Sequence, residues 1–327
     1  MQSTVKDVAL KFGIHAEAVT PASNSGFSGA EVWRISADQG KQYSVKRLAN
    51  MTEDHLAWIH RVLLHTIVCD CDFVPSPQRT KDGMSFHTDG DSLWEVCTWV
   101  PGEADFDTNP SDDRLSHAMK SLAKFHQSAA QVNFDFRPSD GVRARLDGLM
   151  NLKETVKSLH ISSKATVDTY PTLNSLLLQL KQIPSQKRKS LADKLSKFAG
   201  QTLPLQPVIR DLWHDHLLFS GEQLTGLVDF DAMQMDSISL DLTRCLGSIV
   251  PNKFDRWKFA LQAYSSVRPI QPAELELIGL LDPINIVLSS MNWIKWIVVE
   301  KRQFENPMAV ESRLKMLKDR MSQLWLT

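Results

Sequence analysis

Two short stretches beyond the middle of the chain decide how the sequence is interpreted. Residues 208–219 read VIRDLWHDHLLF, and residues 226–231 read GLVDFD. In the first stretch Asp211 follows a strand-like run, and the polar residue His216 comes five positions later. In the second stretch Asp229 follows an apolar run. The intervening sequence has the composition of a hairpin, so we expect both acids and the histidine at the same end of a small sheet.

Phosphoryl transfer needs this kind of residue set. One carboxylate orients or deprotonates the acceptor hydroxyl, and the other binds a Mg²⁺ ion that bridges the nucleotide phosphates. A neutral side chain then completes the metal shell. A plainer interpretation is that both acids only cap turns, as many aspartates near turns do.

The regions outside this segment predict an α+β chain with two parts. About five strands and one main helix are expected in residues 1–100, and a sharp Pro-Gly break follows there. Residues 101–327 are expected to be mostly helical, with a helical insert at about 140–200 and the catalytic loop at 205–231. Apolar periodicity predicts helices over 4–12, 52–68, 112–130, 238–250, 254–266, 272–281, 284–303 and 308–324.

The charge balance excludes some classes of protein. The 327 residues contain 37 Lys and Arg against 38 Asp and Glu, and 43% of residues are hydrophobic. These values argue against disorder and against a generally basic nucleic-acid binder. The total conceals an asymmetry, because residues 140–200 hold 11 basic and 5 acidic residues, a balance of +6. The rest of the chain therefore carries −7.

Cysteine usage and hydropathy predict a cytoplasmic protein with no membrane partner. The four cysteines include no CxxC pair, and Cys69 and Cys71 are too close for a typical disulfide. Residues 1–15 lack the pattern of a signal peptide. No stretch approaches the ~18 apolar residues that would span a membrane.

The segment IRD…H…VDFD resembles the catalytic segment of the aminoglycoside phosphotransferase and choline kinase-like superfamily, which shares the protein-kinase fold. The resemblance covers most of the chain and implies a two-lobed kinase-like fold. It implies that Asp211 is the catalytic residue, that Asp229 binds the metal and that Lys46 contacts the nucleotide phosphates. Asp241 resembles the buried acid that braces the catalytic loop.

The same resemblance implies a nucleotide site in the first part of the chain. The small residues Ser25, Gly26, Ser28 and Gly29 lie where a phosphate-covering loop belongs. The strand end from Glu95 through Cys97 to Trp99 lies where backbone groups meet adenine. The implied cofactors are ATP and Mg²⁺, and the acceptor is a small molecule bearing a hydroxyl group.

Departures from the family pattern leave three interpretations open. His216 replaces the usual asparagine as metal ligand, which makes Mn²⁺ a second candidate because imidazole favours softer ions. The acid expected to pair with Lys46 is unclear: Glu53 is a candidate but lies in the first turn of its helix. His60 is nearer the helix middle, but neutral imidazole is no ion-pair partner.

These departures keep a weakened or inactive, nucleotide-sensing kinase fold as an alternative. A third class is a metal-dependent hydrolase that uses Asp211, His214 and His216, because His-x-His with aspartates can bind zinc. The acceptor also stays open. Aminoglycosides are polycations, so the +6 insert argues against them and permits a neutral or anionic acceptor.

Overall fold

The computed structural model describes residues 2–22, 31–48, 50–161 and 163–324. The chain divides into two compact units, each built from segments that are far apart in the sequence. Unit 1 comprises residues 1–133, 211–234 and 259–269. Unit 2 comprises residues 134–210, 235–258 and 270–327.

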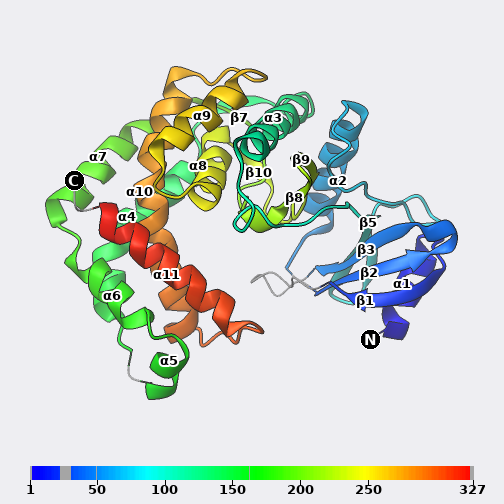
Figure 1. Cartoon of the computed structure of the whole chain (residues 1–327), viewed down its shortest axis with the longest axis horizontal. Coiled ribbons are helices and arrows are strands. Elements are labelled where there is room, and N and C mark those ends of the chain that lie inside the picture. Colours follow the sequence, from blue (N-terminus) through cyan, green and yellow to red (C-terminus); the bar gives the residue numbers. More distant parts are fainter. Residues whose placement is uncertain (1, 23–30, 49, 162, 325–327) are drawn as a thin grey trace. The chain divides into compact units, whose positions relative to one another are not determined.

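Unit 1 is built on a five-stranded antiparallel sheet with the order β1-β2-β3-β5-β4. Its strands, drawn side by side in Figure 1, are β1 (Ala16–Pro21), β2 (Glu31–Ala37), β3 (Gln42–Leu48), β4 (His87–Asp89) and β5 (Ser92–Thr98). A turn at Asp38–Gly40 closes the β2–β3 hairpin, as its composition predicts. This is the strand-rich region expected within residues 1–100.

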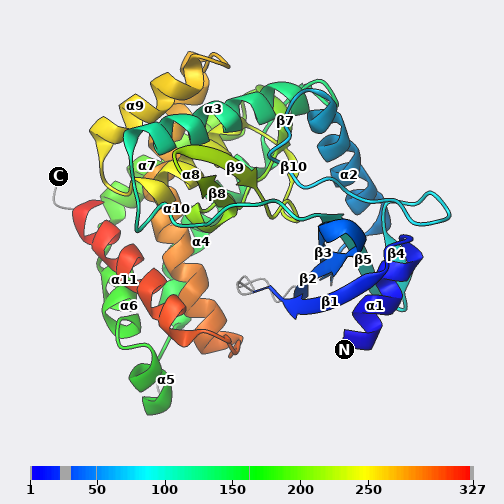
Figure 2. The same ribbon diagram turned by 45° about the vertical axis from the view of Figure 1, so that its right-hand side comes forward.

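The two faces of this sheet bury different side chains because strand residues alternate in direction. Helix α1 (Gln2–Lys11) packs through Val5 and Val8 against one face, where Trp33, Val45 and Val96 are buried. On the other face, Leu56 of helix α2 (Glu53–Val68) clusters with Leu48 and Leu93. Figure 2 draws α2 next to this sheet. Lys46, Glu95 and Cys97 share the strand parity of Leu48 and Leu93, so they belong to the face covered by α2.

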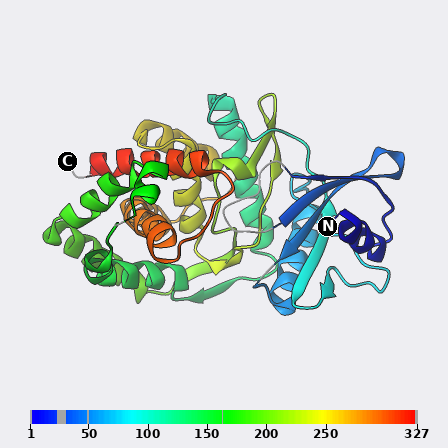
Figure 3. The ribbon, with the colours of Figure 1, turned by 90° about the horizontal axis from the view of Figure 1, so that it is seen from below.

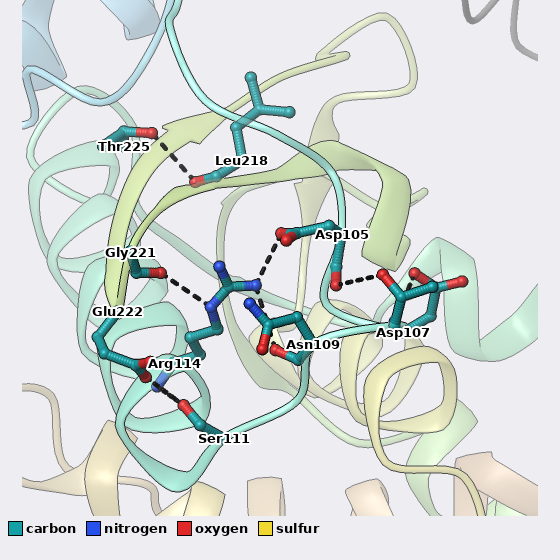
Figure 4. A network of polar contacts seen from close by, with 10 residues as sticks. Asp105, Asp107, Asn109, Ser111, Arg114, Leu218, Gly221, Glu222 and Thr225 are labelled. Atoms are coloured by element: carbon teal, nitrogen blue, oxygen red, sulfur yellow. Dashed lines mark hydrogen bonds and ion pairs between the residues drawn. The ribbon is translucent and has the colours of Figure 1, made fainter.

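Unit 1 also contains a helix that packs against a hairpin. Helix α3 (Asp112–Ala129) packs against the hairpin of β8 (Leu217–Ser220) and β9 (Gln223–Leu227). Arg114, buried at the start of α3, donates to the Gly221 carbonyl at the hairpin tip and to Asp105, at 2.8 and 2.7 Å (Figure 4). Its guanidinium also lies 5.0 Å from the centre of the Phe219 ring. These contacts fix the hairpin that carries Asp229 at its end.

Unit 2 is mainly helical. A three-stranded sheet, β10-β7-β6, comprises β6 (Asp135–Arg137), β7 (Leu203–Val208) and β10 (Gln234–Asp236). Its helices are α4 (Asp140–Ser158), α5 (Lys164–Thr169), α6 (Leu173–Gln182), α7 (Ser185–Ala199), α8 (Ile238–Ile249), α10 (Pro272–Ile294) and α11 (Pro307–Leu324). Helix α9 (Phe254–Ser265) crosses from unit 2 into unit 1. The insert expected at about 140–200 is thus four helices.

Helix α10 is the core of unit 2 and differs from its prediction. It packs against α4, α6, α7, α8 and α11, and Figure 3 shows it in orange among the green and red helices. The sequence predicted a break near Pro283, but the helix continues through it. Proline removes one backbone hydrogen bond, and burial of Ile284, Ile286 and Val287 after it compensates for that loss.

The helical run Pro272–Val299, which ends in a π-helix from Lys295, is long and apolar enough to cross a membrane by those two criteria alone. This differs from the expectation that no stretch is long enough. However, 56% of its most apolar window is buried within the structure. A core helix meets the same two criteria, and the packing of α10 is that of a core helix.

Candidate active site

Lys46 is the centre of a buried cluster of charges. Its Nζ lies 2.9 Å from Asp229 Oδ1 and 2.6 Å from Asp231 Oδ2, and its side chain is 12% exposed. Burial alone would lower the pKa of Lys46, but the carboxylates of Asp229, Asp231 and Glu95 raise it above its ordinary value. The ammonium group therefore stays protonated, as a phosphate-binding lysine must.

Asp231 was not identified from the sequence as a site residue. Burial and the negative charges of Asp229 and Glu95 raise the pKa of Asp231 to about 6, although Lys46 opposes this shift. Burial also acts on Asp229, but there Lys46 and His216 prevail and lower the pKa below its usual value. The sequence signal that could have identified Asp231 is its place in the triplet DFD, where it is the second acid, two residues after Asp229.

His216 and Asp229 face each other in unit 1. The Nδ1 atom of His216 lies 2.9 Å from the backbone carbonyl of Asp211. A carbonyl oxygen only accepts, so Nδ1 carries the proton and donates. In the neutral form of the ring, which is the form that binds a metal, the lone pair is then on Nε2, and this atom lies 3.5 Å from Asp229 Oδ2. A hydrogen bond of this kind orients a metal-ligating histidine and fixes its tautomer.

These two side chains fit a divalent cation. Asp229 supplies a carboxylate held ionised by its neighbours, and His216 supplies a ring nitrogen with its lone pair available. Mg²⁺ is commonly bound by one or two protein carboxylates together with substrate phosphates, so a small protein ligand set is sufficient. The left-handed backbone of Asp229, with φ of 67°, is the kind of strain found at functional sites.

The carboxylate of Asp211 is oriented by its own loop. The indole Nε1 of Trp213 donates to Asp211 Oδ1 at 2.9 Å. Before Asp211 in the chain, the amides of Ile209 and Arg210 donate to the two oxygens of the buried Asp241 at 2.7 and 2.6 Å. Arg210 has a φ of 70°, which these hydrogen bonds stabilise. Asp241 thus has the bracing position that the family resemblance implies.

Glu53 and Lys46 are not brought together among the described residues. Glu53 accepts a hydrogen bond from Thr88 Oγ1 at 2.8 Å, because the first turn of α2 lies beside β4. The contact between α2 and the strand face is made instead by His60, whose Nε2 lies 2.7 Å from Glu95 Oε2. Burial raises the pKa of Glu95, but His60 and Lys46 outweigh it, and the net pKa is lowered.

Glu95 is therefore a side chain of the charge cluster. It pairs across the strands with Lys46 and contributes to the raised pKa of that lysine. In the sequence, His60 is a candidate only as an ion-pair partner of Lys46, and a neutral imidazole cannot form that ion pair. Glu95 interacts with both residues because the alternation of β5 turns its carboxylate toward α2.

The end of β5 has two backbone amides that are already hydrogen-bonded. Thr98 N donates to Ser76 O and Trp99 N to Gln42 O, both at 3.0 Å. Contacts with adenine would therefore use other backbone groups of this segment. The Cys97 side chain is buried, and burial together with the Glu95 charge raises the pKa of its thiol.

Two groups of sequence-derived candidates remain. Ser25, Gly26, Ser28 and Gly29 lie outside the described residues. Within the described part of the chain, Asp211, His214 and His216 do not form a three-ligand group, whereas the donor atoms of His60, Glu95 and Cys97 lie within 4.8 Å of one another. The hydrogen bond between His60 and Glu95 and the nearby Lys46 charge explain that second group without a metal.

Sequence comparison relates the chain to known kinases. A profile of the phosphotransferase enzyme family matches residues 19–274, which is well over half of the chain. The homoserine kinase of Agrobacterium fabrum (strain C58 / ATCC 33970) is 34% identical over 94 residues, or 27% of this chain and 29% of that protein. The homoserine kinase of Parvibaculum lavamentivorans is 36% identical over 84 residues, or 24% and 26%. The matched segments thus span less than a third of these relatives.

Structural comparison agrees over almost the whole chain. A spectinomycin phosphotransferase in complex with ADP and spectinomycin has a TM-score of 0.64 at 13% identity, covering 99% of this chain and 94% of that one. The amicoumacin kinase hAmiN in complex with AMP-PNP, Ca²⁺ and Ami has a TM-score of 0.64 at 16% identity, with coverages of 99% and 96%. At these identities the likeness shows the fold, and the expected kinase-like α+β fold is confirmed.

Proposed function

We propose that this chain, which belongs to the phosphotransferase enzyme family, is a small-molecule kinase that transfers the γ-phosphate of ATP to a hydroxyl group of a small acceptor. The observation that carries this proposal is the position of Asp229, between the Lys46 ammonium at 2.9 Å and the Nε2 atom of His216 at 3.5 Å. A carboxylate flanked by a cation and by an oriented imidazole suits a site that receives polyphosphate and metal.

In this proposal each residue has a separate task. Lys46 binds the nucleotide phosphates. Asp229 and His216 would hold Mg²⁺ or Mn²⁺, and the ion would neutralise charge on those phosphates. Asp211 accepts the proton of the acceptor hydroxyl as its oxygen bonds to the γ-phosphorus. The bond between the γ-phosphorus and the β,γ-bridging oxygen breaks, and ADP leaves with that oxygen. Most of the rate acceleration then comes from positioning and charge stabilisation.

The remaining assignments belong to the same proposal. We place the phosphate-covering loop at residues 25–29 and the adenine contacts at the backbone around residues 95–99. The lobes are residues 1–100 and 101–327, with ATP and metal bound between them. The location is cytoplasmic, and all four cysteines are free thiols, which suits a reducing compartment.

Replacement of Asp211 by asparagine tests the assigned reaction. Asp211→Asn keeps the shape of the side chain but cannot accept the proton, so kcat should fall by about 10²–10⁴. The KM and Kd for ATP should change little, because Asp211 does not contact the nucleotide in this mechanism. Turnover is measured as ADP release with an acceptor found by screening hydroxylated compounds.

Asp215→Asn is the matched control, since Asp215 lies four residues later in the same loop and its side chain is 39% exposed. It should keep activity near the wild-type value. Unchanged turnover in Asp211→Asn contradicts the catalytic assignment. ATP binding by the wild type without ADP release from any acceptor favours the nucleotide-sensing alternative.

A further inference from the structure

Strand β6, residues Asp135–Arg137, lies at the edge of the sheet in unit 2. The sheet order is β10-β7-β6, so β6 has a strand on one side and, within the described part of the chain, none on the other. A free edge presents backbone N–H and C=O groups to a further strand. The edge of β6 is therefore a place where another chain can add a strand through main-chain hydrogen bonds.

The backbone of Phe136 is the part of β6 that faces this free edge. Phe136 lies opposite Pro204 of β7, and proline has no N–H group. The two residues therefore cannot exchange a pair of hydrogen bonds, and the backbone groups of such a residue point away from its partner strand. In agreement with this, the Phe136 amide donates to the side chain of its own neighbour, at 2.7 Å from Asp135 Oδ1.

Two exposed phenylalanines accompany the free edge. Phe134 and Phe136 are 49% and 65% exposed, and their ring centres lie 5.1 Å apart in an edge-to-face arrangement. The contact puts both rings on the same side of the segment, as the alternation of strand residues requires. Aromatic residues are enriched in protein interfaces, so this pair marks the edge as an interaction surface.

The charges of β6 identify its partner as a second copy of the same strand. Asp135 and Arg137 have opposite signs and flank Phe136 on either side. If two copies of β6 pair antiparallel about Phe136, Asp135 of each copy lies opposite Arg137 of the other. These are positions without ladder hydrogen bonds, where side chains come closest. Charges usually protect an edge strand from pairing, but here each charge meets its opposite.

The ion pairs within one chain allow this exchange of partners. Arg137 Nη1 lies 2.9 Å from Asp140 Oδ2, and Arg137 Nε lies 3.4 Å from Asp135 Oδ2. All three side chains are largely exposed, and ion pairs of this kind contribute little stability by themselves. Asp135 can therefore exchange its own arginine for that of the second copy, while Arg137 keeps its contact with Asp140.

We propose that this edge is a homodimer contact in which two β6 strands pair antiparallel about a two-fold axis at Phe136. Each Phe136 amide then donates to the Phe136 carbonyl of the second copy. Four phenylalanine rings gather on one face of the pair, and two ion pairs between Asp135 and Arg137 form on the other. Because a strand of three residues buries little surface, the dimer is weak and forms reversibly. The contact is independent of the proposed kinase function, because it needs neither ATP nor acceptor.

Sedimentation velocity of the full chain over a wide range of protein concentration tests this contact. The wild type should change from monomer to dimer as the concentration rises. Phe136→Ser should raise the dissociation constant by about tenfold or more, because it removes the central aromatic contact. Phe254→Ser is the matched control, since Phe254 is also in unit 2 and is 71% exposed. It should keep the wild-type dissociation constant.

Charge reversals test the antiparallel register. Asp135→Arg places arginine opposite arginine in both pairs, and Arg137→Asp places aspartate opposite aspartate. Each variant alone should have a dissociation constant raised by about tenfold or more. A mixture of the two variants restores both pairs of opposite charge, so it should form a heterodimer about as tightly as the wild type. Recovery within one chain is impossible, because each variant still carries two like charges.

Three results overturn the proposal. A wild type that stays monomeric at every concentration excludes the contact. A dimer that Phe136→Ser and both charge reversals leave unchanged is formed by another surface. Charge reversals that dissociate the dimer but do not associate when mixed contradict the register. Association of the mixture alone, between variants that melt near the wild-type temperature, supports the proposal.

Discussion

At the scale of single residues, the imidazole of His216 distinguishes this chain from the family pattern of asparagine. The Asp211 carbonyl fixes the proton of His216 on Nδ1, so Nε2 presents its lone pair toward Asp229. Imidazole binds transition metals more strongly than it binds Mg²⁺, whereas an amide oxygen suits Mg²⁺. The metal preference of the enzyme should therefore depend on this one side chain.

We expect His216→Asn to lower the ratio of Mn²⁺-supported to Mg²⁺-supported activity, by about threefold or more. The variant exchanges a nitrogen ligand for an oxygen ligand of similar reach. Steady-state rates across a series of both metal ions measure the ratio. His214→Asn is the control, since His214 lies in the same turn and is given no metal role. An unchanged ratio in His216→Asn excludes its imidazole as a ligand.

At the scale of elements, helix α2 is coupled to the active-site face of the sheet by His60. This side chain is 1% exposed and bonds Glu95, which is next to Lys46 across the strands. Glu95, on strand β5, therefore lies beside Lys46, whereas the sequence predicted an acidic partner for this lysine on helix α2. The position of α2 therefore affects the charge around Lys46, because His60 on α2 is bonded to the carboxylate beside this lysine.

His60→Ala should reduce the free energy of unfolding by about 2–4 kcal/mol, because it leaves a cavity and an incompletely paired buried carboxylate. It should also raise the KM for ATP more than it lowers kcat, since we propose that Lys46 binds the phosphates. Chemical denaturation and ATP kinetics measure the two effects. His60→Gln keeps a donor and should recover part of both losses.

Arg61→Ala is the matched control for this helix, because Arg61 is exposed. It should change stability by less than about 0.5 kcal/mol. If His60→Ala lowers stability without changing the KM for ATP, the histidine only packs the helix and does not position Lys46.

The network at the start of α3 predicts a pH effect. The hydrogen bond from Arg114, opposed by some desolvation, lowers the pKa of Asp105 (Figure 4). A carboxylate with a lowered pKa stabilises the fold above its unfolded pKa, and that contribution is lost as pH falls through the lower, folded value. Asp105→Asn should therefore be less stable at pH 7 and lose less stability between about pH 5 and pH 2.

Denaturation midpoints across this pH range measure the difference. Asp107→Asn is the control, because Asp107 is exposed and, among the residues that the structure describes, its side chain accepts only from the amide of Thr108, at 2.9 Å. It should follow the wild-type curve. Parallel curves for Asp105→Asn and the wild type would mean that the contact with Arg114 contributes no pH-dependent stability.

At the scale of the whole molecule, ligand-dependent stability distinguishes a nucleotide-binding kinase fold from a metal-dependent hydrolase. ATP with Mg²⁺ or Mn²⁺ at about 100 times its Kd should stabilise the native state by about 2.7 kcal/mol. For a chain of this size that corresponds to a rise of several degrees in melting temperature. Thermal-shift measurements with nucleotide, metal and both together provide the test. Stabilisation by Zn²⁺ alone would instead favour the metal-dependent hydrolase.

The sequence anticipated most of the local structure. The β2–β3 and β8–β9 hairpins, the helix at α2 and the helix at α3 all agree with prediction, because turn composition and apolar periodicity are local signals. The prediction failed at Pro283, where burial of α10 outweighs the local cost of proline. Glu53 was inferred as a partner of Lys46 from its place on a helix, and packing places it beside Thr88.

By itself, the sequence determined the family, the kinase-like fold and the segment containing Asp211, His216 and Asp229, since these are encoded by residue type and short spacing. Only the tertiary structure decided which acids neutralise Lys46, because Asp229 is 183 residues away and Glu95 depends on strand register. Such groupings depend on which side chains lose contact with water, and this is decided by packing and not by spacing along the chain.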